Sequence, residues 1–349
     1  MTLSTYGDRM TYSAHSVSDA AARTGNLPRG LSREIALRSD AILFSGQRQV
    51  QMKTLDLKPP EAGDLIVEVA WSGISTGTER LLWSGDMPPF PGLAYPLVPG
   101  YEAVGRVIHT EGNPDWHGEY VFVPGANCFE EASGLFGASA SRLIVPEARA
   151  VRLGHTAQSS DVLLALAATA HHAVMKTSLP DLIIGHGVLG QLAARLVIAL
   201  GGEAPMVWET NSARHAADHY SVVDPAHDDH RAYALICDMS GNVSAIDTAI
   251  QHATKGAEIV LAGFYASRVS FEFPAAFMRE ISFKIAAEWE ASDLDAVLTL
   301  CRKGLLSLDG LVTHTAEPHE ATRAYKTAFT EADCLKMVLD WRGHHDHLA

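Results

Sequence analysis

Three glycines in the middle of the chain have the spacing of turns that bind phosphate groups. Residues 185–190 read Gly-His-Gly-Val-Leu-Gly, after an apolar run at 182–184 and before a helix-like segment at 191–200. In such a strand–turn–helix unit, the first glycine permits the bend, the second lets backbone N–H groups approach a pyrophosphate, and the third allows close packing. The predicted dinucleotide-binding residues are Gly185, Gly187, Val188, Leu189 and Gly190. A glycine turn that binds no ligand is the alternative.

An acidic residue follows the next apolar run at the distance expected of a ribose contact. Glu209 comes directly after Met-Val-Trp at 206–208, nineteen residues beyond Gly190. A carboxylate at this place accepts hydrogen bonds from both hydroxyls of the adenosine ribose and repels a 2′-phosphate. The pattern therefore favours NAD over NADP as the cofactor.

The composition is that of a globular protein with an acidic balance. The chain has 349 residues, of which 47% are hydrophobic and 19% charged, and this length suffices for two domains. A net charge of −14 argues against nucleic acid or an anionic membrane as a partner, because phosphate contacts need clustered Lys and Arg. No apolar run has the length of a membrane span. Four scattered cysteines indicate a reducing compartment, the cytoplasm.

Short strand-like segments separated by turn residues dominate the first part of the chain. They lie at residues 41–44, 49–52, 65–69, 103–109, 120–123 and 142–145. Regular spacing of this kind is typical of an antiparallel, barrel-like domain. The stretch 71–99 is dense in Gly, Pro, Ser and Thr, so we expect a loop there. Residues 1–36 lack the apolar core of a secretory signal, and we expect a disordered extension.

Strands and helices alternate in the second part. We expect an Ala/Leu-rich helix at 162–175 and strands at 182–184, 206–208, 222–223, 234–237, 258–261 and 282–285. Six strands with intervening helices make a complete doubly wound sheet. The tail, 293–340, reads as helix, strand, helix and strand, and we expect it to return to the first domain. The predicted domains are 37–155 with 291–349, and 156–290.

This order of elements resembles the medium-chain dehydrogenase/reductase superfamily over residues 38–341. The resemblance implies an α/β fold with a GroES-like antiparallel barrel-type catalytic domain, a doubly wound Rossmann domain and a homodimer. Segments 72–79, 83–91, 95–103, 123–128 and 166–170 are similar to the branch that acts in bacteriochlorophyll biosynthesis. That likeness implies NAD-dependent oxidation of the hydroxyethyl group of a bacteriochlorophyllide or chlorophyllide substrate to an acetyl group.

The positions that hold zinc in metal-dependent members of the superfamily differ in this chain. Those members have a Cys after an early strand, a His in a Gly-His-Glu turn and a third ligand before the Rossmann domain. Here residues 75–76 are Ser-Thr, 100–102 are Gly-Tyr-Glu and 167–171 are Ala-Ala-Thr-Ala-His. Neutral hydroxyls are poor zinc ligands. We therefore expect no catalytic metal; the alternative is an unusual site of Glu79, Glu102 and His171.

Without a metal, a side chain must take the proton of the alcohol as hydride leaves, which contributes roughly a hundred- to ten-thousandfold in rate. Tyr101 occupies a former ligand position and suits the part of a donor or relay, because a phenol loses its proton only near pH 10. An imidazole titrates near neutrality, so His171, or its neighbour His172, is the candidate acceptor. The predicted catalytic residues are Tyr101, His171, Ser75, Thr76 and Glu102. Each of them could instead serve packing or loop structure.

A flat macrocycle needs a wide apolar opening with a few polar anchors. The segment 83–95 offers large side chains on a loop stiffened by prolines. The predicted substrate-binding residues are Trp83, Met87, Phe90 and Tyr95. A packed rim without ligand contacts is the alternative.

Two other functions are compatible with these motifs. A zinc-free quinone or enoyl reductase of the same superfamily would prefer NADPH, and Glu209 argues against it. The second alternative is a catalytically silent protein that binds a dinucleotide and acts as a sensor or scaffold. It is compatible because the positions that hold zinc in metal-dependent members carry other residues here.

Overall fold

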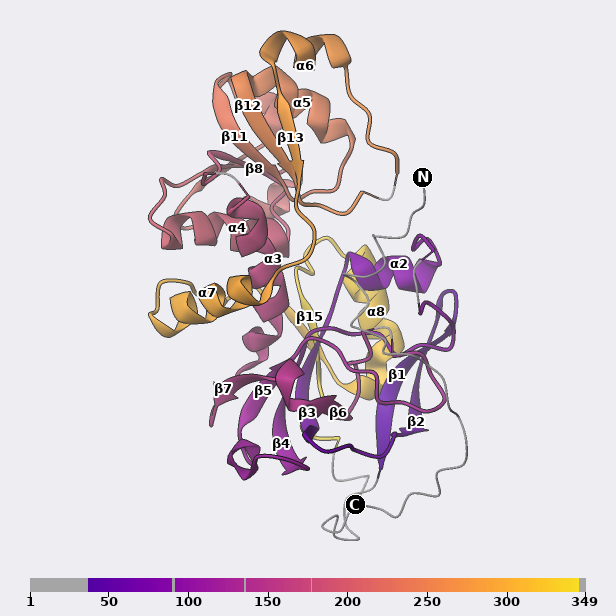
Figure 1. The fold of residues 1–349 in the computed structure, drawn as a ribbon. Helices are drawn as coiled ribbons and strands as arrows, with labels where there is room; N and C mark the ends of the chain where they lie inside the picture. Colours follow the sequence, from indigo (N-terminus) through magenta and orange to yellow (C-terminus); the bar gives the residue numbers. More distant parts are fainter. Residues whose placement is uncertain (1–36, 90–91, 135, 177, 266, 345–349) are drawn as a thin grey trace, which may run out of the picture.

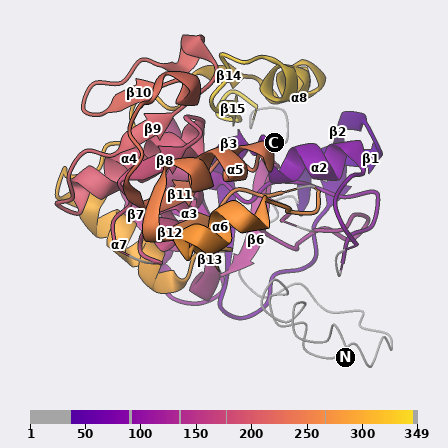
Figure 2. The same ribbon diagram turned by 90° about the horizontal axis from the view of Figure 1, so that it is seen from above.

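The computed structural model describes residues 37–89, 92–134, 136–176, 178–265 and 267–344. The extension expected at 1–36 and the candidate substrate contact Phe90 lie outside the described residues. Figure 1 shows a parallel sheet in the upper half of the molecule and antiparallel strands in the lower half. Seen from above in Figure 2, β1, β2 and α2 lie to one side of the parallel sheet.

The lower half is built around β3 (Asp64–Ile74), whose apolar sequence is buried along most of its length. The strand order is β14-β15-β3-β4-β5-β7, and β6 also pairs with β3. A separate hairpin of β1 and β2 contributes Ile42 and Phe44 to the same core. The six strands predicted for this half are confirmed. The other strands of this half are β1 (Arg38–Gly46), β2 (Gln49–Asp56), β4 (Ala103–Thr110), β5 (Tyr120–Val123), β6 (Arg142–Pro146), β7 (Val151–Gly154), β14 (His314–Ala316) and β15 (Met337–Asp340).

The stretch 71–99 is not a loop throughout, so that prediction was wrong in part. β3 continues to Ile74, and a short helix, α2 (Thr78–Ser84), follows it. Pairing with β4 and β15 overrides the weak strand preference of the Ser and Gly residues near the end of β3. Leu82 buries its side chain in the core and Gly85 ends the helix with a left-handed conformation, φ 83°.

The upper half is a six-stranded parallel sheet in the order β10-β9-β8-β11-β12-β13. Alternate residues of a strand face opposite sides, and β8 shows this: Ile183 packs with α3 and α4, whereas Leu182 and Ile184 pack with α5 and α6. Helices on both faces confirm the predicted doubly wound sheet. The elements are β8 (Leu182–Ile184), β9 (Met206–Trp208), β10 (Ser221–Val223), β11 (Tyr233–Asp238), β12 (Ala253–Leu261), β13 (Ser282–Ile285), α3 (Leu164–Val174), α4 (Val188–Ala199), α5 (Ser244–His252), α6 (Phe273–Arg279) and α7 (Ala291–Arg302).

Two predicted helix boundaries differ from the structure. The helix after the glycine turn begins at Val188 rather than at residue 191, because Gly187 already serves as its N-cap. The helix expected over 162–175 is preceded by a 3-10 turn at Ser159–Leu163, and α3 itself ends at Val174.

The tail has the predicted order of helix, strand, helix and strand: α7, β14, α8 (Ala321–Thr330) and β15. β15 pairs antiparallel with β3, so that Leu339 lies opposite Ser72. The fully buried Trp341 follows, and its indole N–H donates to the Ser72 hydroxyl at 2.9 Å. The tail therefore completes the lower sheet rather than the upper one.

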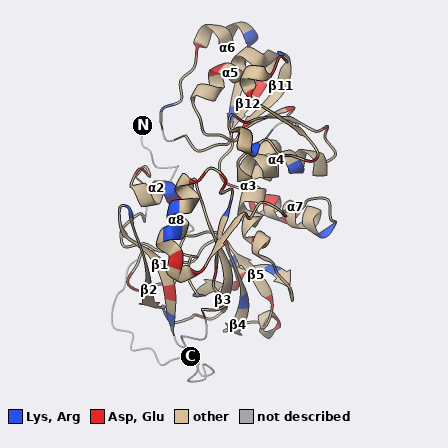
Figure 3. Cartoon of the chain, turned by 180° about the vertical axis from the view of Figure 1, so that it is seen from behind, with Lys and Arg blue, Asp and Glu red and all other residues tan. Residues whose placement is uncertain are grey.

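The distribution of charged residues and the length of the apolar helices are relevant to possible partners. Figure 3 shows basic and acidic residues on both halves of the molecule, so Lys and Arg are not confined to one of them. Within the described ranges, no helix is long and apolar enough to cross a bilayer.

Candidate functional site

The glycine turn joins β8 to α4 at the carboxyl end of the parallel sheet. Gly185 has φ 94°, and a Cβ there would lie 3.1 Å from atoms of Ser240, in the turn after β11. A Cβ at Gly190 would lie 1.8 Å from the carbonyl oxygen of Gly185. At Gly187 no atom lies within 4 Å of such a Cβ, so its backbone is open to a ligand. Two glycines are thus required by packing, and the third leaves room for a phosphate at the helix start.

Glu209 lies at the end of β9, beside this turn. Its carboxylate accepts a hydrogen bond from the backbone N–H of His186 at 3.0 Å and another from that of Asn211 at 2.8 Å. The imidazole of His186 is buried and bonds the hydroxyl of Tyr220 at 2.8 Å. The structure therefore brings together Glu209 and the turn, as a ribose contact next to a pyrophosphate requires.

A further acid lies where the strands end. Asp238, the last residue of β11, is fully buried. It accepts hydrogen bonds from the N–H and hydroxyl of Ser240 at 2.7 and 2.6 Å, and from the hydroxyl of Tyr265 at 2.6 Å. Burial raises the pKa of Asp238 above its ordinary value, against these hydrogen bonds. Asp238 therefore ties the loop after β12 to the turn beside the glycines.

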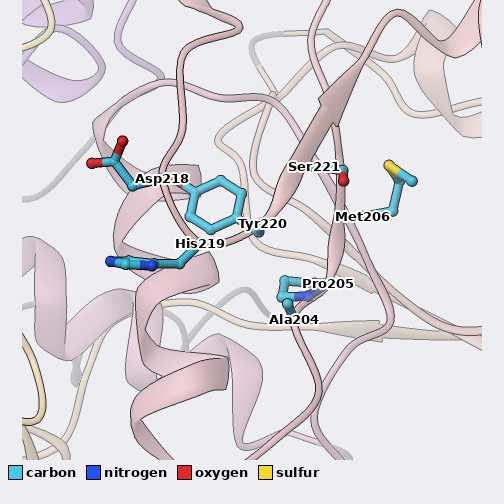
Figure 4. A pocket seen from close by; sticks show the side chains of 7 residues that line it. All are labelled: Ala204, Pro205, Met206, Asp218, His219, Tyr220 and Ser221. Carbon is cyan, nitrogen blue, oxygen red and sulfur yellow. The ribbon is translucent and has the colours of Figure 1, made fainter.

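One surface cavity lies elsewhere on this sheet. It has a volume of about 380 Å³ and is drawn in Figure 4. Met206 and Ser221, the first residues of β9 and β10, are part of its lining. Tyr220 also lines the cavity, and its hydroxyl bonds His186 of the glycine turn, so the cavity adjoins the turn through this side chain.

A pair of hydroxyl groups lies where β3 ends and β4 begins. The Ser75 and Tyr101 hydroxyl oxygens are 2.7 Å apart. Tyr101 follows Gly100, whose φ of 103° and close approach to the backbone of Ser139 admit no side chain. Burial, and next the charge of Glu102, raise the pKa of Tyr101 above its ordinary value. The phenol therefore stays neutral near pH 7 and can donate or accept a hydrogen bond.

An ion pair that sequence reasoning missed lies next to these hydroxyls. The ammonium of Lys336 contacts Oε2 of Glu102, and the two side chains are 1% and 0% exposed. The other oxygen of Glu102, Oε1, is buried without a hydrogen-bond partner. Burial raises the pKa of Glu102 and the charge of Lys336 opposes the shift. The one available sequence signal was a lysine inside an apolar segment, Leu335 to Leu339.

A second buried carboxylate, that of Glu79, contacts Ser75. Glu79, in α2, accepts hydrogen bonds from the N–H of Ser75 at 3.2 Å and from the hydroxyl of Tyr325 at 2.8 Å. Burial, which outweighs these hydrogen bonds, raises the pKa of Glu79 to about 8. Thr76 is half-buried between β3 and α2. The structure thus places Ser75, Thr76, Tyr101 and Glu102 in one region.

The predicted acceptor His171 is held by a different part of the chain. Its Nδ1 lies 2.7 Å from Oδ1 of Asp293 on α7, and Nδ1 of the neighbouring His172 lies 2.8 Å from Oδ2 of the same carboxylate. Asp293 also accepts the N–H of Glu290 at 2.8 Å. In the part of the chain that the structure describes, no hydrogen bond joins His171 to Tyr101, so a relay between them would need a bridging group.

Three of the predicted substrate contacts, Trp83, Met87 and Tyr95, lie around α2 and are half-buried. Trp83 and Phe329 have ring centroids 5.5 Å apart, and the hydroxyl of Tyr95 donates to the carbonyl of Leu82. Met87 packs against the same core. Their remaining exposed surface is available to a ligand.

The residues present do not fit a zinc ion. Ser75 and Tyr101 offer neutral hydroxyls that already bond each other. The ammonium of Lys336, which contacts Glu102, would repel a divalent metal ion. Within the described ranges, the alternative set of Glu79, Glu102 and His171 does not gather within ligand distance. His314, Glu331 and Asp333 do, in a largely exposed group on the tail.

Comparison with curated proteins places the chain in a family. It is 50% identical over 315 residues to the 2-desacetyl-2-hydroxyethyl bacteriochlorophyllide A dehydrogenase of Cereibacter sphaeroides, covering 88% of this chain and 99% of that protein. It is 49% identical over 311 residues to the dehydrogenase of the same name from Rhodobacter capsulatus, with the same shares. The chain belongs to this dehydrogenase family. The resemblance to the bacteriochlorophyll branch that the sequence analysis noted is thereby confirmed. In a separate comparison, no model of a known protein family matches the chain.

Solved structures show the fold of this bacteriochlorophyllide dehydrogenase homologue. The 2R,3R-butanediol dehydrogenase of Bacillus subtilis superposes with a TM-score of 0.75 at 20% identity, covering 86% of this chain and 99% of that one. The acetophenone reductase of Geotrichum candidum, solved with NAD, gives 0.74 at 17% identity, with 88% and 98% covered. The predicted combination of a catalytic and a Rossmann fold is confirmed.

Replacing Glu79 by glutamine should change how stability depends on pH. In the unfolded chain this carboxyl ionises near 4.5, and in the folded chain near 8. Folding therefore binds a proton between these values, and the wild type loses stability as pH rises through that window, by up to about 1.4 kcal/mol per pH unit. The amide of the substituted side chain cannot ionise, so the variant should lack this loss.

Urea unfolding of both proteins between pH 5 and pH 8 measures the effect. The difference in unfolding free energy should move in favour of Glu79→Gln as pH rises. Parallel profiles would contradict the raised pKa.

Proposed function

We propose that the chain oxidises the 3-(1-hydroxyethyl) group of bacteriochlorophyllide a, or of chlorophyllide a, to a 3-acetyl group with NAD as hydride acceptor, a step of bacteriochlorophyll a biosynthesis. The observation that carries this proposal is the 50% identity to the Cereibacter sphaeroides dehydrogenase over almost the whole of both chains. The site supplies groups suited to hold a secondary alcohol and take its proton.

The choice of NAD rests on Glu209 and the glycine turn. The open backbone at Gly187 admits a pyrophosphate, and a carboxylate bonded to the N–H of His186 lies where it would repel a 2′-phosphate. The acetophenone reductase with a similar fold was solved with NAD. Bound here, NAD supplies the atom that accepts the hydride.

The proposed reaction uses side chains in place of a metal. Hydride leaves the carbinol carbon, the hydroxyl proton leaves the oxygen, and a ketone remains. The Ser75–Tyr101 pair binds the substrate oxygen and passes the proton on, since each hydroxyl both donates and accepts. His171 is the proposed final acceptor. Because Asp293 bonds its Nδ1, the Nε2 atom is the one available to accept a proton.

The macrocycle is proposed to lie against the segment around α2. Trp83, Met87 and Tyr95 present partly exposed apolar surface there, and the guanidinium of Arg48 lies 5.9 Å from the ring of Trp83. Phe90 remains a candidate in the same segment. An apolar face with a cation at its edge suits a flat pigment that carries carboxylate groups.

We also propose a cytoplasmic homodimer. β13 is an edge strand of the parallel sheet, and Ile285 at its end is 73% exposed. The neighbouring helix α6 exposes Phe273, Phe277 and Met278. An edge strand flanked by apolar surface is a site where a second copy can pair. The four cysteines are free thiols, as a reducing compartment requires.

Incubation of the purified protein with NAD and the hydroxyethyl pigment under anaerobic conditions tests the activity. Oxidation to the acetyl pigment should shift its absorption and form one NADH per pigment, and a chelator should not slow the reaction. Binding without turnover would instead support the scaffold, and NADPH-dependent reduction of a quinone or enone would support the reductase. A tightly held zinc lost together with activity would contradict the metal-free site.

Light scattering of the purified protein tests the proposed homodimer and should give a mass of two chains per particle.

Replacing Glu209 by alanine tests the cofactor assignment. The variant loses the ribose hydrogen bonds and the repulsion of a 2′-phosphate, so its affinity for NAD should fall by about tenfold and its affinity for NADP should rise. Calorimetric titration with both cofactors measures this. An unchanged preference would count against the ribose contact.

Tyr101→Phe tests the hydroxyl pair. The change removes one oxygen and keeps the ring, so kcat should fall by roughly a hundredfold while the KM for the pigment changes little. Thr76→Val, which alters a neighbouring hydroxyl outside the Ser75–Tyr101 bond, serves as the comparison and should have a smaller effect. Wild-type turnover in the phenylalanine variant would leave Tyr101 as packing.

A further inference from the structure

The pair of Lys336 and Glu102 is the least expected feature of the site. Of the lysines that the structure describes, Lys336 alone is buried. Moving two ions out of water is costly, and a well-packed apolar pair is often as stable as a buried ion pair. Stability alone therefore does not explain why this chain has the pair.

The pair lies in the hydroxyl site because of strand register. Met337, the first residue of β15, lies opposite Ile74 of β3, so the preceding residue, Lys336, enters beside Ser75. Directly opposing residues of antiparallel strands have Cβ atoms about 5 Å apart. A lysine from the tail of the chain thus lies beside a residue of the first sheet that is proposed to bind the substrate oxygen.

Gly73 provides the room for the pair. A Cβ at this position would lie 2.2 Å from Oε2 of Glu102 and 2.8 Å from Cε of Lys336. The N–H of Gly73 also donates to the carbonyl oxygen of Glu102 at 2.8 Å. The strand β3, which ends directly before Ser75, therefore contacts Glu102 through its backbone and leaves space for the charged side chain of Lys336.

The position of Tyr101 depends on Glu102, because the two residues share a peptide bond. One oxygen of Glu102 bonds the ammonium, and the other is buried without a partner. If the ammonium were lost, the carboxylate would be left buried with no bond to either oxygen, and it would have to move or take up a proton. Either change would disturb the residue that precedes it.

We propose that Lys336 is a positioning residue of the oxidation: its ammonium holds the carboxylate of Glu102, and this sets where the Tyr101 hydroxyl meets Ser75 and the substrate oxygen. The inference rests on the proposed function. It adds Lys336, a residue to which that proposal gives no role. In this inference the positively charged group beside the two hydroxyls is the ammonium of Lys336, which comes from the tail of the chain.

The test uses a double variant that removes both charges together. Lys336→Met with Glu102→Gln leaves no unpaired ion, so we expect the protein to fold with an unfolding midpoint close to that of the wild type. Its kcat should fall by between about tenfold and a hundredfold, with the KM for the pigment and the affinity for NAD unchanged within about twofold. Lys336→Met alone should lose stability as well as kcat.

A matched control comes from an ion pair outside the site. Lys53 and Glu131 lie 3.4 Å apart on the surface, and both are about half exposed. The same two substitutions there, Lys53→Met with Glu131→Gln, should leave kcat at the wild-type value.

The outcomes separate the inference from the proposed function. Wild-type kcat in the Lys336→Met, Glu102→Gln protein would overturn the inference and leave the function intact. A loss of kcat matched by an equal loss of NAD affinity or of stability would also overturn it, because the pair would then hold the fold in general. A wild-type protein that binds the pigment but does not oxidise it would refute the function, and the inference with it.

Discussion

The antiparallel pairing of β15 with β3 is the contact on which the site depends. It brings the last described strand of the chain to the centre of the first sheet, with Leu339 opposite Ser72. The same register places Lys336 beside Ser75 and lets Trp341 bond the hydroxyl of Ser72. The site is therefore incomplete until both ends of the chain have folded together. Non-local pairing of this kind is slow to form, because a long loop must close first.

Several buried polar groups share one small region around Ser75, and their charges balance only as a set. The opposite charges of Glu102 and Lys336 cancel each other. Glu79, with its raised pKa of about 8, is mostly protonated at neutral pH and so carries little charge. The hydroxyls of Tyr101 and Tyr325 remain neutral as well, because burial raises the pKa of each. The region therefore has almost no net charge, although two acids and one base lie in it. Neutrality of this kind lets a cluster of polar side chains exist inside a core.

Sequence reasoning worked where the signal is local. The glycine spacing at 185–190, the apolar strands and the alternation of the second half predicted the parallel sheet and its turn, because strand, turn and helix follow one another in the chain. It failed where partners are remote. Lys336 lies 234 residues from Glu102 and Asp293 lies 122 residues from His171, and no periodicity reports such pairs. The composition of 71–74 misled for the same reason, because pairing with β15 and β4 makes these residues part of a strand.

The carboxylate of Asp293 has a mechanical consequence. It holds two consecutive imidazoles of α3 and caps the start of α7, the helix that leads from β13 back to β14. These two helices are therefore joined through a single carboxylate. A change in the angle between α3 and α7 must therefore break at least one of the two contacts between Asp293 and the consecutive imidazoles.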